Sequence, residues 1–203
     1  MVQTANDIGT FFSGVWPLSF FGVDELALFF SLILIAIACI IMGAGIPTTA
    51  TYIILVAVAA PALSLMGVEP LVSHFFVFYY GVLADITPPV ALAAYAAAGI
   101  SGSNPFKTGN TAFRLGIAKA LVPFVFVYSP ALLLVADGFS WYTFTVTFAG
   151  ALCGIGLIGA AFTGYLFKTM PNWARWYTGI VSLLFIAPGL NTMVIGILLL
   201  TPI

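Results

Sequence analysis

A run without a single charged residue, from Leu26 to Val68, most constrains what this chain can fold into. A helix needs about 20 apolar residues to cross the hydrocarbon core of a bilayer, so this run is long enough for two such limbs. The whole chain has the same character, because 63% of its 203 residues are hydrophobic and only 5% are charged. Soluble domains carry roughly 25% charged residues. The sequence therefore predicts an all-α, polytopic membrane protein.

The apolar runs predict how the chain is organised. The long run gives two limbs, Leu26–Met42 and Ala50–Met66, joined by "GAGIPTT". Leu71–Ala84 and Val90–Gly99 form one span that is broken at "DITPP". The remaining predicted spans are Ala120–Ala136 (with Pro123 and Pro130 as kinks), Trp141–Leu166 and Tyr177–Leu200.

These elements fall into four segments. Segment 1–23 is too short and broken to span, and its aromatic residues suit an interfacial position. It has neither the basic start nor the compact apolar core that is typical of a signal peptide. Segment 24–67 is a helical hairpin, and 68–136 holds the broken helix, a basic cytoplasmic loop and the next span. Segment 137–203 is expected to form two C-terminal transmembrane helices. The interfacial aromatic residues are Phe11, Phe12, Trp16 and Phe20.

Charge predicts the orientation. If Leu71–Gly99 crosses the membrane once, the basic stretches lie on one side of it. The turns on the other side then contain the acidic residues Asp24, Glu25, Glu69 and Asp137. The positive-inside rule then makes the basic side cytoplasmic. No basic stripe indicates nucleic-acid binding. The basic residues fall in two stretches, Lys107, Arg114 and Lys119 in the first and Lys168 and Arg175 in the second.

The first break places helix breakers and hydroxyls in the most apolar region. Gly43 and Gly45 free the backbone, and Pro47 with Thr48 and Thr49 opens the second limb. Either both limbs span fully and a loop joins them, or a re-entrant hairpin keeps its tip in the membrane. The tip has no charge, which favours the hairpin. Irregular backbone at membrane depth must be buried in protein or line a watery cavity.

The second break carries an ionisable residue. A helix over Leu71–Ala84 places Asp85 roughly 20 Å inward from Glu69, and an ionisable residue at that depth is a functional candidate. Thr87 and Pro88 form a suitable N-cap and first position for a new helix, and Pro89 follows. The first half-helix should therefore end near Asp85 and the second should start near Pro88.

Such helix ends have opposite polarity. Carbonyl ends can bind a cation, whereas amide ends favour an anion. Paired breaks of this kind are typical of the ion and substrate site of a secondary transporter. Two alternatives stay open: the breaks only kink the helices, and Asp85 is a protonated or hydrogen-bonded structural group.

Three long motifs resemble the large membrane subunit of tripartite ATP-independent periplasmic (TRAP) transporters. They are "GAGIPTTATYIILVAVAAPAL", "HFFVFYYGVLADITPPVALAAYAAAGISGSNPFKTG" and "AFRLGIAKALVPFVFVYSPALLL". The nearest form is the fused 4TM/12TM permease, whose extra C-terminal helices resemble "GYLFKTMPNWARW" and "APGL". The resemblance implies sodium-coupled import of a carboxylate that a periplasmic binding protein delivers. It also implies an elevator motion and a place in a bacterial or archaeal cytoplasmic membrane.

The resemblance covers the second of the family's two inverted repeats. It implies that the re-entrant tip contains Gly43, Gly45, Pro47, Thr48 and Thr49, and that the broken helix contains Asp85, Thr87, Pro88 and Pro89. Plainer members of the family often have an apolar residue in place of Asp85. The first repeat is missing, so we expect a fragment, a split gene product or a truncated chain that needs the missing N-terminal half. A non-transporting structural or assembly subunit is the alternative.

Other motifs favour packing over chemistry. "GIGLIG" fits a dinucleotide fingerprint but has no preceding strand, and Gly150 and Gly154 favour close helix packing. An enzyme is not expected, because no nucleophile and base pair lies in a span. His74 is either a packed or interfacial residue or a ligand. Cys39 and Cys153 are interpreted as small hydrophobic residues, and Asn191 is interpreted as an interhelical hydrogen-bond donor.

Overall fold

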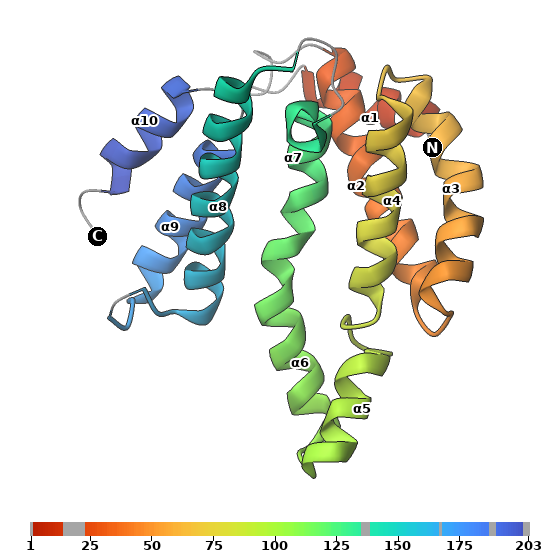
Figure 1. Cartoon of the computed structure of the whole chain (residues 1–203), viewed down its shortest axis with the longest axis vertical. Coiled ribbons are helices and arrows are strands. Elements are labelled where there is room, and N and C mark those ends of the chain that lie inside the picture. Colours follow the sequence, from red (N-terminus) through yellow and green to blue (C-terminus); the bar gives the residue numbers. More distant parts are fainter. Residues whose placement is uncertain (1, 14–22, 135–138, 167, 187–189, 201–203) are drawn as a thin grey trace. The chain divides into compact units, whose positions relative to one another are not determined.

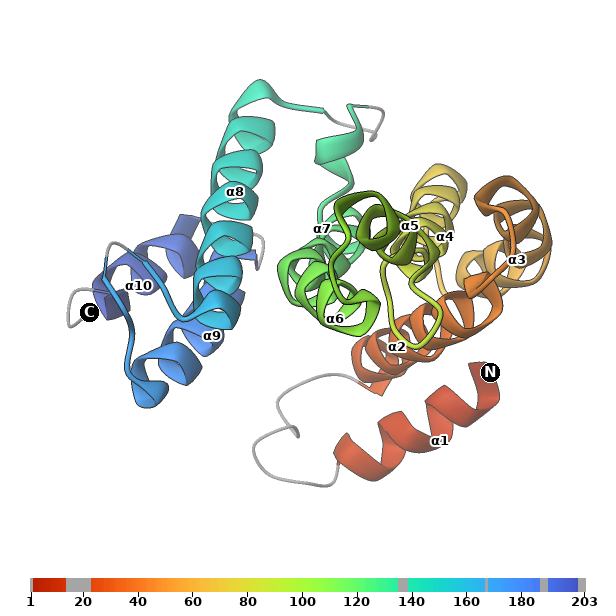
Figure 2. The ribbon, with the colours of Figure 1, turned by 90° about the horizontal axis from the view of Figure 1, so that it is seen from below.

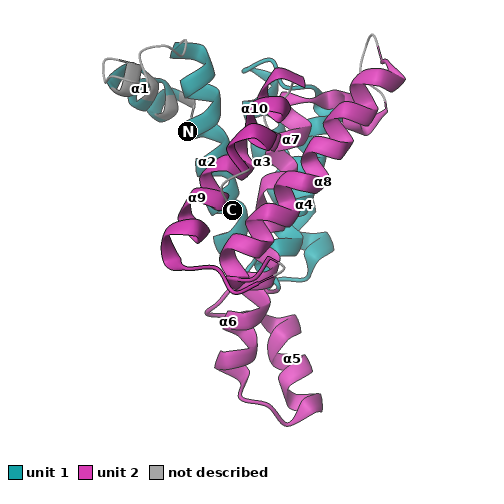
Figure 3. Cartoon of the chain, turned by 90° about the vertical axis from the view of Figure 1, so that its left-hand side faces the viewer, with its two compact units in different colours: residues 1–85 teal, residues 86–203 magenta. Residues whose placement is uncertain are grey.

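The structure is a computed structural model that describes residues 2–13, 23–134, 139–166, 168–186 and 190–200. The described chain is helical and divides into two compact units, Met1–Asp85 and Ile86–Ile203, which Figure 3 colours separately. The boundary falls inside the second predicted break, between Asp85 and Ile86.

Unit 1 is built from the predicted hairpin and the first half of the broken helix. It contains α1 (Val2–Ser13), α2 (Val23–Gly43), α3 (Thr48–Ser64) and α4 (Pro70–Ala84) (Figure 1). α4 packs against both α2 and α3, while α1 packs against α2. Leu32, Leu63 and Phe76 are fully buried in this core. The two predicted limbs are therefore confirmed as helices.

The lengths of these helices bear on how they meet a membrane. α2 has 21 residues and is long and apolar enough to cross a bilayer, whereas α3 has 17 residues and α4 has 15. The position of the α2–α3 turn relative to the bilayer stays a prediction. α1, with 12 residues, is too short to span, as expected for segment 1–23. Phe11 is exposed on α1; the side chain of Phe12, and Trp16 and Phe20, lie outside what the structure describes.

The first part of unit 2 corrects one prediction. Its elements are α5 (Leu92–Ser101), α6 (Pro105–Gly116), η2 (Ile117–Leu121), α7 (Val122–Tyr128) and η3 (Pro130–Leu133). The first basic stretch, predicted to be a loop, is helical instead, with Lys107 and Arg114 on α6 and Lys119 on η2. The Asn104 side chain accepts a hydrogen bond from the Lys107 amide (3.1 Å), and Pro105 occupies the first turn. These are ordinary helix-start signals.

Helical structure continues from α6 towards the predicted span. Pro105–Tyr128 is long and apolar enough to cross a membrane by its length and composition, so helical structure begins at Pro105, before the predicted span that starts at Ala120. The chain tightens into the 3₁₀ form of η2 just before Pro123, and α7 ends at Tyr128, before Pro130. Both prolines therefore mark irregular points of the span, as expected for residues that remove a helical hydrogen bond.

The C-terminal part of unit 2 contains α8 (Trp141–Thr163), α9 (Asn172–Ile186) and α10 (Leu190–Leu200). α8 confirms the helix predicted over Trp141–Leu166, and it is long and apolar enough to cross a membrane. The prediction of a single span over Tyr177–Leu200 is wrong, because α10 packs back against α9 (Figure 2). The Tyr177 hydroxyl donates to the Leu199 carbonyl at 2.7 Å, although a continuous helix would separate these residues by about 33 Å.

The sequence holds the reason for this correction. Residues 187–189 read Ala-Pro-Gly, and proline and glycine together interrupt a helix. Their apolar surroundings conceal the break in a reading based on hydropathy. The described residues of segment 137–203 therefore supply one helix long enough to span, α8, and a helical hairpin of α9 and α10.

Small residues hold α8 against α9, as predicted. A Cβ atom placed on Gly150 would lie 2.6 Å from the Phe185 carbonyl oxygen. One placed on Gly154 would lie 3.0 Å from the Ser182 carbonyl oxygen. Because both contacting oxygen atoms belong to the backbone, a side-chain rotation cannot relieve either contact, and the two helices would have to move apart. The Gly150–Gly154 pair thus sets the closest approach of the two helices.

This packing gives a first prediction. Gly150→Ala should destabilise the protein by about 1–3 kcal/mol, the usual cost of overpacking. Gly156→Ala is the matched control, because nothing lies within 4 Å of a Cβ atom at that position. Thermal unfolding of both variants in the same detergent would compare them. Equal melting temperatures would contradict the close approach of α8 and α9 at Gly150.

Candidate functional site

The first break forms a tight turn between α2 and α3. α2 ends at Gly43, and the Ile46 amide donates to the Gly43 carbonyl (3.4 Å). Gly45 has a φ of 84°, a left-handed conformation that glycine adopts without strain. α3 then begins at Thr48, directly after Pro47, as predicted.

The start of α3 leaves amide groups without helical partners. Pro47 occupies the N-cap position and provides no side-chain acceptor. The Thr51 amide bonds to the Pro47 carbonyl (3.0 Å), so the open amides are those of the three preceding residues. Thr48 is half-buried and Thr49 is exposed at this end. This end of α3 carries partial positive charge.

Three helix ends converge at Gly43. A Cβ atom on Gly43 would lie 2.8 Å from the Ala84 Cβ and 3.4 Å from the Gly81 carbonyl oxygen, both in the last turn of α4. It would also lie 3.2 Å from the Thr51 methyl group, in the first turn of α3. The carbonyl ends of α2 and α4 therefore meet the amide end of α3 at one point. All these groups belong to unit 1.

Thr51 is a residue of this site that the sequence reading missed. Its side chain is buried, and its hydroxyl donates to the Ile46 carbonyl at 3.4 Å. It fastens the turn to the first turn of α3. A signal was available, because Thr51 lies three residues after Thr48 and thus on the same helix face.

α4 ends as predicted, with Asp85 next to the convergence. Asp85 is the C-cap residue, and its amide donates to the Val82 carbonyl (3.3 Å). Its side chain is half-buried and forms no hydrogen bond or ion pair within the described part of the chain.

The second break, in unit 2, differs from the prediction. The helix after it starts at Leu92, not near Pro88, and its N-cap is Ala91 (φ 37°), not Thr87. Two consecutive prolines lack amide donors, and the second disfavours a helical conformation of the first. The chain therefore needs a further turn, in which the Ala91 amide bonds to the Thr87 carbonyl (3.1 Å).

Contacts within unit 2 fix this connecting segment. The Tyr95 hydroxyl donates to the Pro89 carbonyl at 2.8 Å, and the Ile86 side chain packs where a Cβ atom of Gly116 would stand. The open amides of α5 are consequently those after Ala91, further along the chain than predicted.

His74 packs between helices of unit 1. Its Nδ1 lies 2.7 Å from the Tyr52 hydroxyl, which joins α3 to α4. The Tyr52 ring also makes an edge contact with Phe78. This partner supports the packed interpretation of His74 over the ligand interpretation.

The two basic stretches meet at the C-terminal end of α8. Arg114 from α6 donates to the Phe162 carbonyl (3.4 Å). Arg175 from α9 donates to the Ala161 carbonyl through Nε and to the Phe162 carbonyl through a terminal nitrogen, both at 2.9 Å. Cations at this position complement the helix dipole. The prediction that both basic stretches lie on one side is thus supported within unit 2.

The second prediction concerns which side this is. In a background with Cys153→Ala, a cysteine at Ser140 should react with a membrane-impermeant reagent from outside, and one at Thr169 should not. Both positions are exposed and stand beyond opposite ends of α8. The orientation follows from the positive-inside rule. Labelling at Thr169 but not at Ser140 would show that the chain has the opposite orientation.

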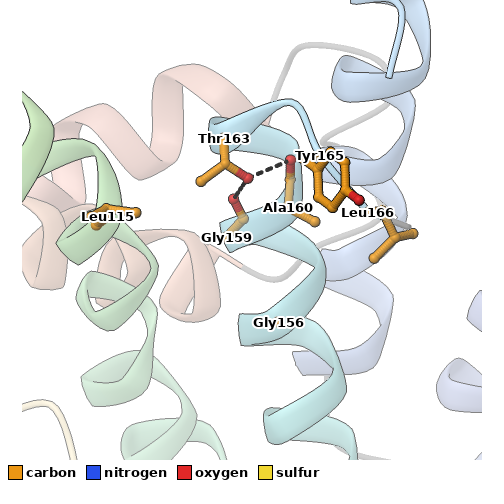
Figure 4. A pocket seen from close by; sticks show the side chains of 7 residues that line it. All are labelled: Leu115, Gly156, Gly159, Ala160, Thr163, Tyr165 and Leu166. Carbon is orange, nitrogen blue, oxygen red and sulfur yellow. Dashed lines mark hydrogen bonds between the residues drawn. The ribbon is translucent and has the colours of Figure 1, made fainter. Parts of the chain in front are cut away.

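A hollow of about 540 Å³ lies beside the same end of α8 (Figure 4). The Thr163 hydroxyl in its wall already donates to the carbonyls of Gly159 (2.9 Å) and Ala160 (3.2 Å). Most of the remaining wall is glycine or apolar, so we assign no chemistry to it. Its lining residues are Leu115, Gly156, Gly159, Ala160, Thr163, Tyr165 and Leu166.

These features define the class of protein. Among the described residues, three helices are long and apolar enough to cross a membrane: Val23–Gly43, Pro105–Tyr128 and Trp141–Thr163. Helical structure is interrupted after Gly43 and after Ala84, where polar backbone is left open. The chain is a multi-pass, all-α membrane protein with the paired breaks that are typical of secondary transporters.

Comparison with known families identifies this chain further. The model of the family described as "Tripartite ATP-independent periplasmic transporter, DctM component" matches residues 19–140, which is more than half of the chain and includes both breaks. The chain belongs to this family, which is a transporter component and not an enzyme family. α8, α9 and α10 follow the matched range. Neither the curated proteins nor the solved structures compared with the chain include a match.

Proposed function

We propose that this chain forms the C-terminal half of a secondary-active TRAP permease that couples sodium entry to the import of a carboxylate. A periplasmic binding protein delivers the substrate, and the missing N-terminal half supplies the other repeat. The protein works in the cytoplasmic membrane of a bacterium or archaeon. The convergence of the ends of α2 and α4 with the start of α3 at Gly43 is the observation that carries this proposal.

The cation site that we propose lies within unit 1. The last carbonyl groups of α4 and of α2 have no later helical amide from which they could accept a hydrogen bond. Both helix ends lie at Gly43. The Asp85 carboxylate follows directly, and the hydroxyls of Thr48 and Thr49 stand at the start of α3. All these ligands are oxygen atoms, which suit a hard cation such as sodium.

The amide groups at the starts of helices supply the site that we propose for the substrate carboxylate. The open amides of α3 carry partial positive charge beside the same convergence, which favours a substrate carboxylate. The open amides of α5, after Ala91, offer a second such end in unit 2. Because a bound sodium ion adds positive charge near the α3 amides, it strengthens carboxylate binding, and this links the two ligands.

Reconstituted vesicles test the proposal. The chain, its N-terminal half and the binding protein would be combined, and uptake of a radiolabelled carboxylate would be measured with an inward sodium gradient. Replacement of sodium by potassium should abolish uptake. Equal uptake in both salts would refute sodium coupling. A correctly assembled complex that transports none of a panel of carboxylates would favour a structural or assembly subunit.

A further inference from the structure

A groove of about 660 Å³ lies in unit 2 between η2, α8 and α9. Most of its wall is aliphatic, from residues such as Leu121, Ile158 and Leu183. Asn172 and Arg175, at the start of α9, provide its polar groups. The groove is therefore amphipathic, with its charge gathered at one end.

The length of the groove matches one leaflet of a bilayer. The wall formed by α9 runs from Asn172 to Leu183, which is about 16 Å along a helix axis. The hydrocarbon core of a bilayer is about 30 Å thick. From Arg175 to Leu183 the wall is about 12 Å long, so a ligand whose charged group sits at Arg175 would extend an apolar tail most of the way to the bilayer midplane.

Arg175 is held in place at the polar end. Its bonds to the Ala161 and Phe162 carbonyls fix the guanidinium, which also lies 3.3 Å from a Cβ position on Gly164. A guanidinium has five N–H donors, so about three stay available beyond these two bonds. They offer a preorganised site for the oxygen atoms of a phosphate group.

The charge around this end is positive. Residues 86–203 contain all five basic residues of the chain and only one acidic residue, Asp137, which precedes α8 in the sequence. Arg114 bonds to the same Phe162 carbonyl as Arg175, and Lys119 is exposed on η2. The polar end of the groove is therefore complementary to an anion.

Aromatic residues indicate the depth of this end. Trp176 lines the groove and is 78% exposed, and the nearby Trp173 is 63% exposed. Tryptophan is enriched at membrane–water interfaces. A soluble anion would need neither this interfacial level nor an apolar wall of leaflet length, whereas a phospholipid would need both.

We propose that this groove binds one anionic phospholipid from the leaflet on the basic side. The phosphate is held by Arg175 and Asn172, and an acyl chain lies along Ile158, Ile180 and Leu183. Basic pockets between membrane helices recognise anionic headgroups in this way. The inference is independent of sodium coupling and of the transported substrate.

Native mass spectrometry of the full chain in detergent tests the proposal, with phosphatidylglycerol and phosphatidylcholine titrated separately. Phosphatidylglycerol should bind about fivefold or more tightly than phosphatidylcholine, because the basic residues attract its net charge. Arg175→Gln should remove that difference. Leu183→Trp should fill the apolar end and weaken binding of both lipids. The matched control Leu152→Trp changes a residue outside the groove and should bind both lipids as the unaltered chain does.

Three results would overturn the proposal. Equal binding of the two lipids would remove the role of charge, and unchanged binding by Leu183→Trp would remove the role of the groove. Displacement of phosphatidylglycerol by glycerol phosphate alone would indicate a site for a soluble anion. Arg175→Gln also removes hydrogen bonds to the end of α8. If that variant does not fold, Leu183→Trp decides, because it leaves Arg175 unchanged.

Discussion

Replacement of Gly43 by valine is expected to lower the initial rate of substrate uptake by the assembled transporter at least about tenfold. A Cβ atom at this position would lie 2.8 Å from the Ala84 Cβ and 3.2 Å from the Thr51 methyl group. Atoms anchored so close to the backbone cannot rotate away, so α2 and α4 must separate. Overpacking costs about 1–3 kcal/mol. A cost of about 1.4 kcal/mol already lowers the equilibrium constant for the close-packed arrangement of the helix ends tenfold.

The control for this variant lies at the same convergence. Gly81→Ala adds a Cβ atom 3.6 Å from the Thr51 methyl group, which is ordinary van der Waals contact. We expect it to retain uptake and stability. Initial rates in vesicles and melting temperatures in detergent should be measured for both variants. Uptake by Gly43→Val at the unaltered rate would show that the close approach of the three helix ends has no part in transport.

The sequence predicts unit 1 well, because its signals are strong and local. The limbs and the first break follow from a charge-free run interrupted by glycine, proline and threonine, and α4 ends beside Asp85 as expected. What the sequence does not reveal is that Gly43 meets the end of α4, since this depends on packing between helices distant in the chain. The role of Thr51 differs, because its contact with Ile46 is local and its spacing from Thr48 is visible in the sequence.

Two of the errors in unit 2 have a common cause. In both places hydropathy and the local helix signals indicate different structures, and the local signals agree with the fold. Asn104 and Pro105 start a helix in a stretch whose polarity predicts a loop. α9 ends at Ile186, before the sequence Ala-Pro-Gly, in a stretch apolar enough to predict a longer helix. At the second break the opposite error occurred. Thr87 and Pro88 form a good helix start, but the additional Pro89 delays the helix to Leu92.

The largest expected effect on ion coupling comes from removing oxygen ligands at the proposed cation site. Thr49→Val keeps the shape of the side chain but removes its hydroxyl, at the start of α3 beside the turn. Because hydrogen bonds and ligands to a charged group contribute about 1.5–3 kcal/mol, the sodium concentration for half-maximal uptake should rise about tenfold or more. Binding-protein docking should change less.

Asp85→Asn distinguishes a ligand from a bystander at the end of α4. The amide retains one carbonyl oxygen but loses the negative charge, so sodium activation should weaken if the carboxylate contacts the ion and should be unaltered if it does not. Thr143→Val is a suitable control, because it removes an exposed hydroxyl from α8. The measurement is uptake against sodium concentration, with binding-protein affinity determined separately. An unchanged sodium dependence in Thr49→Val would mean that the proposed cation site is wrong, even though the helix ends meet as described.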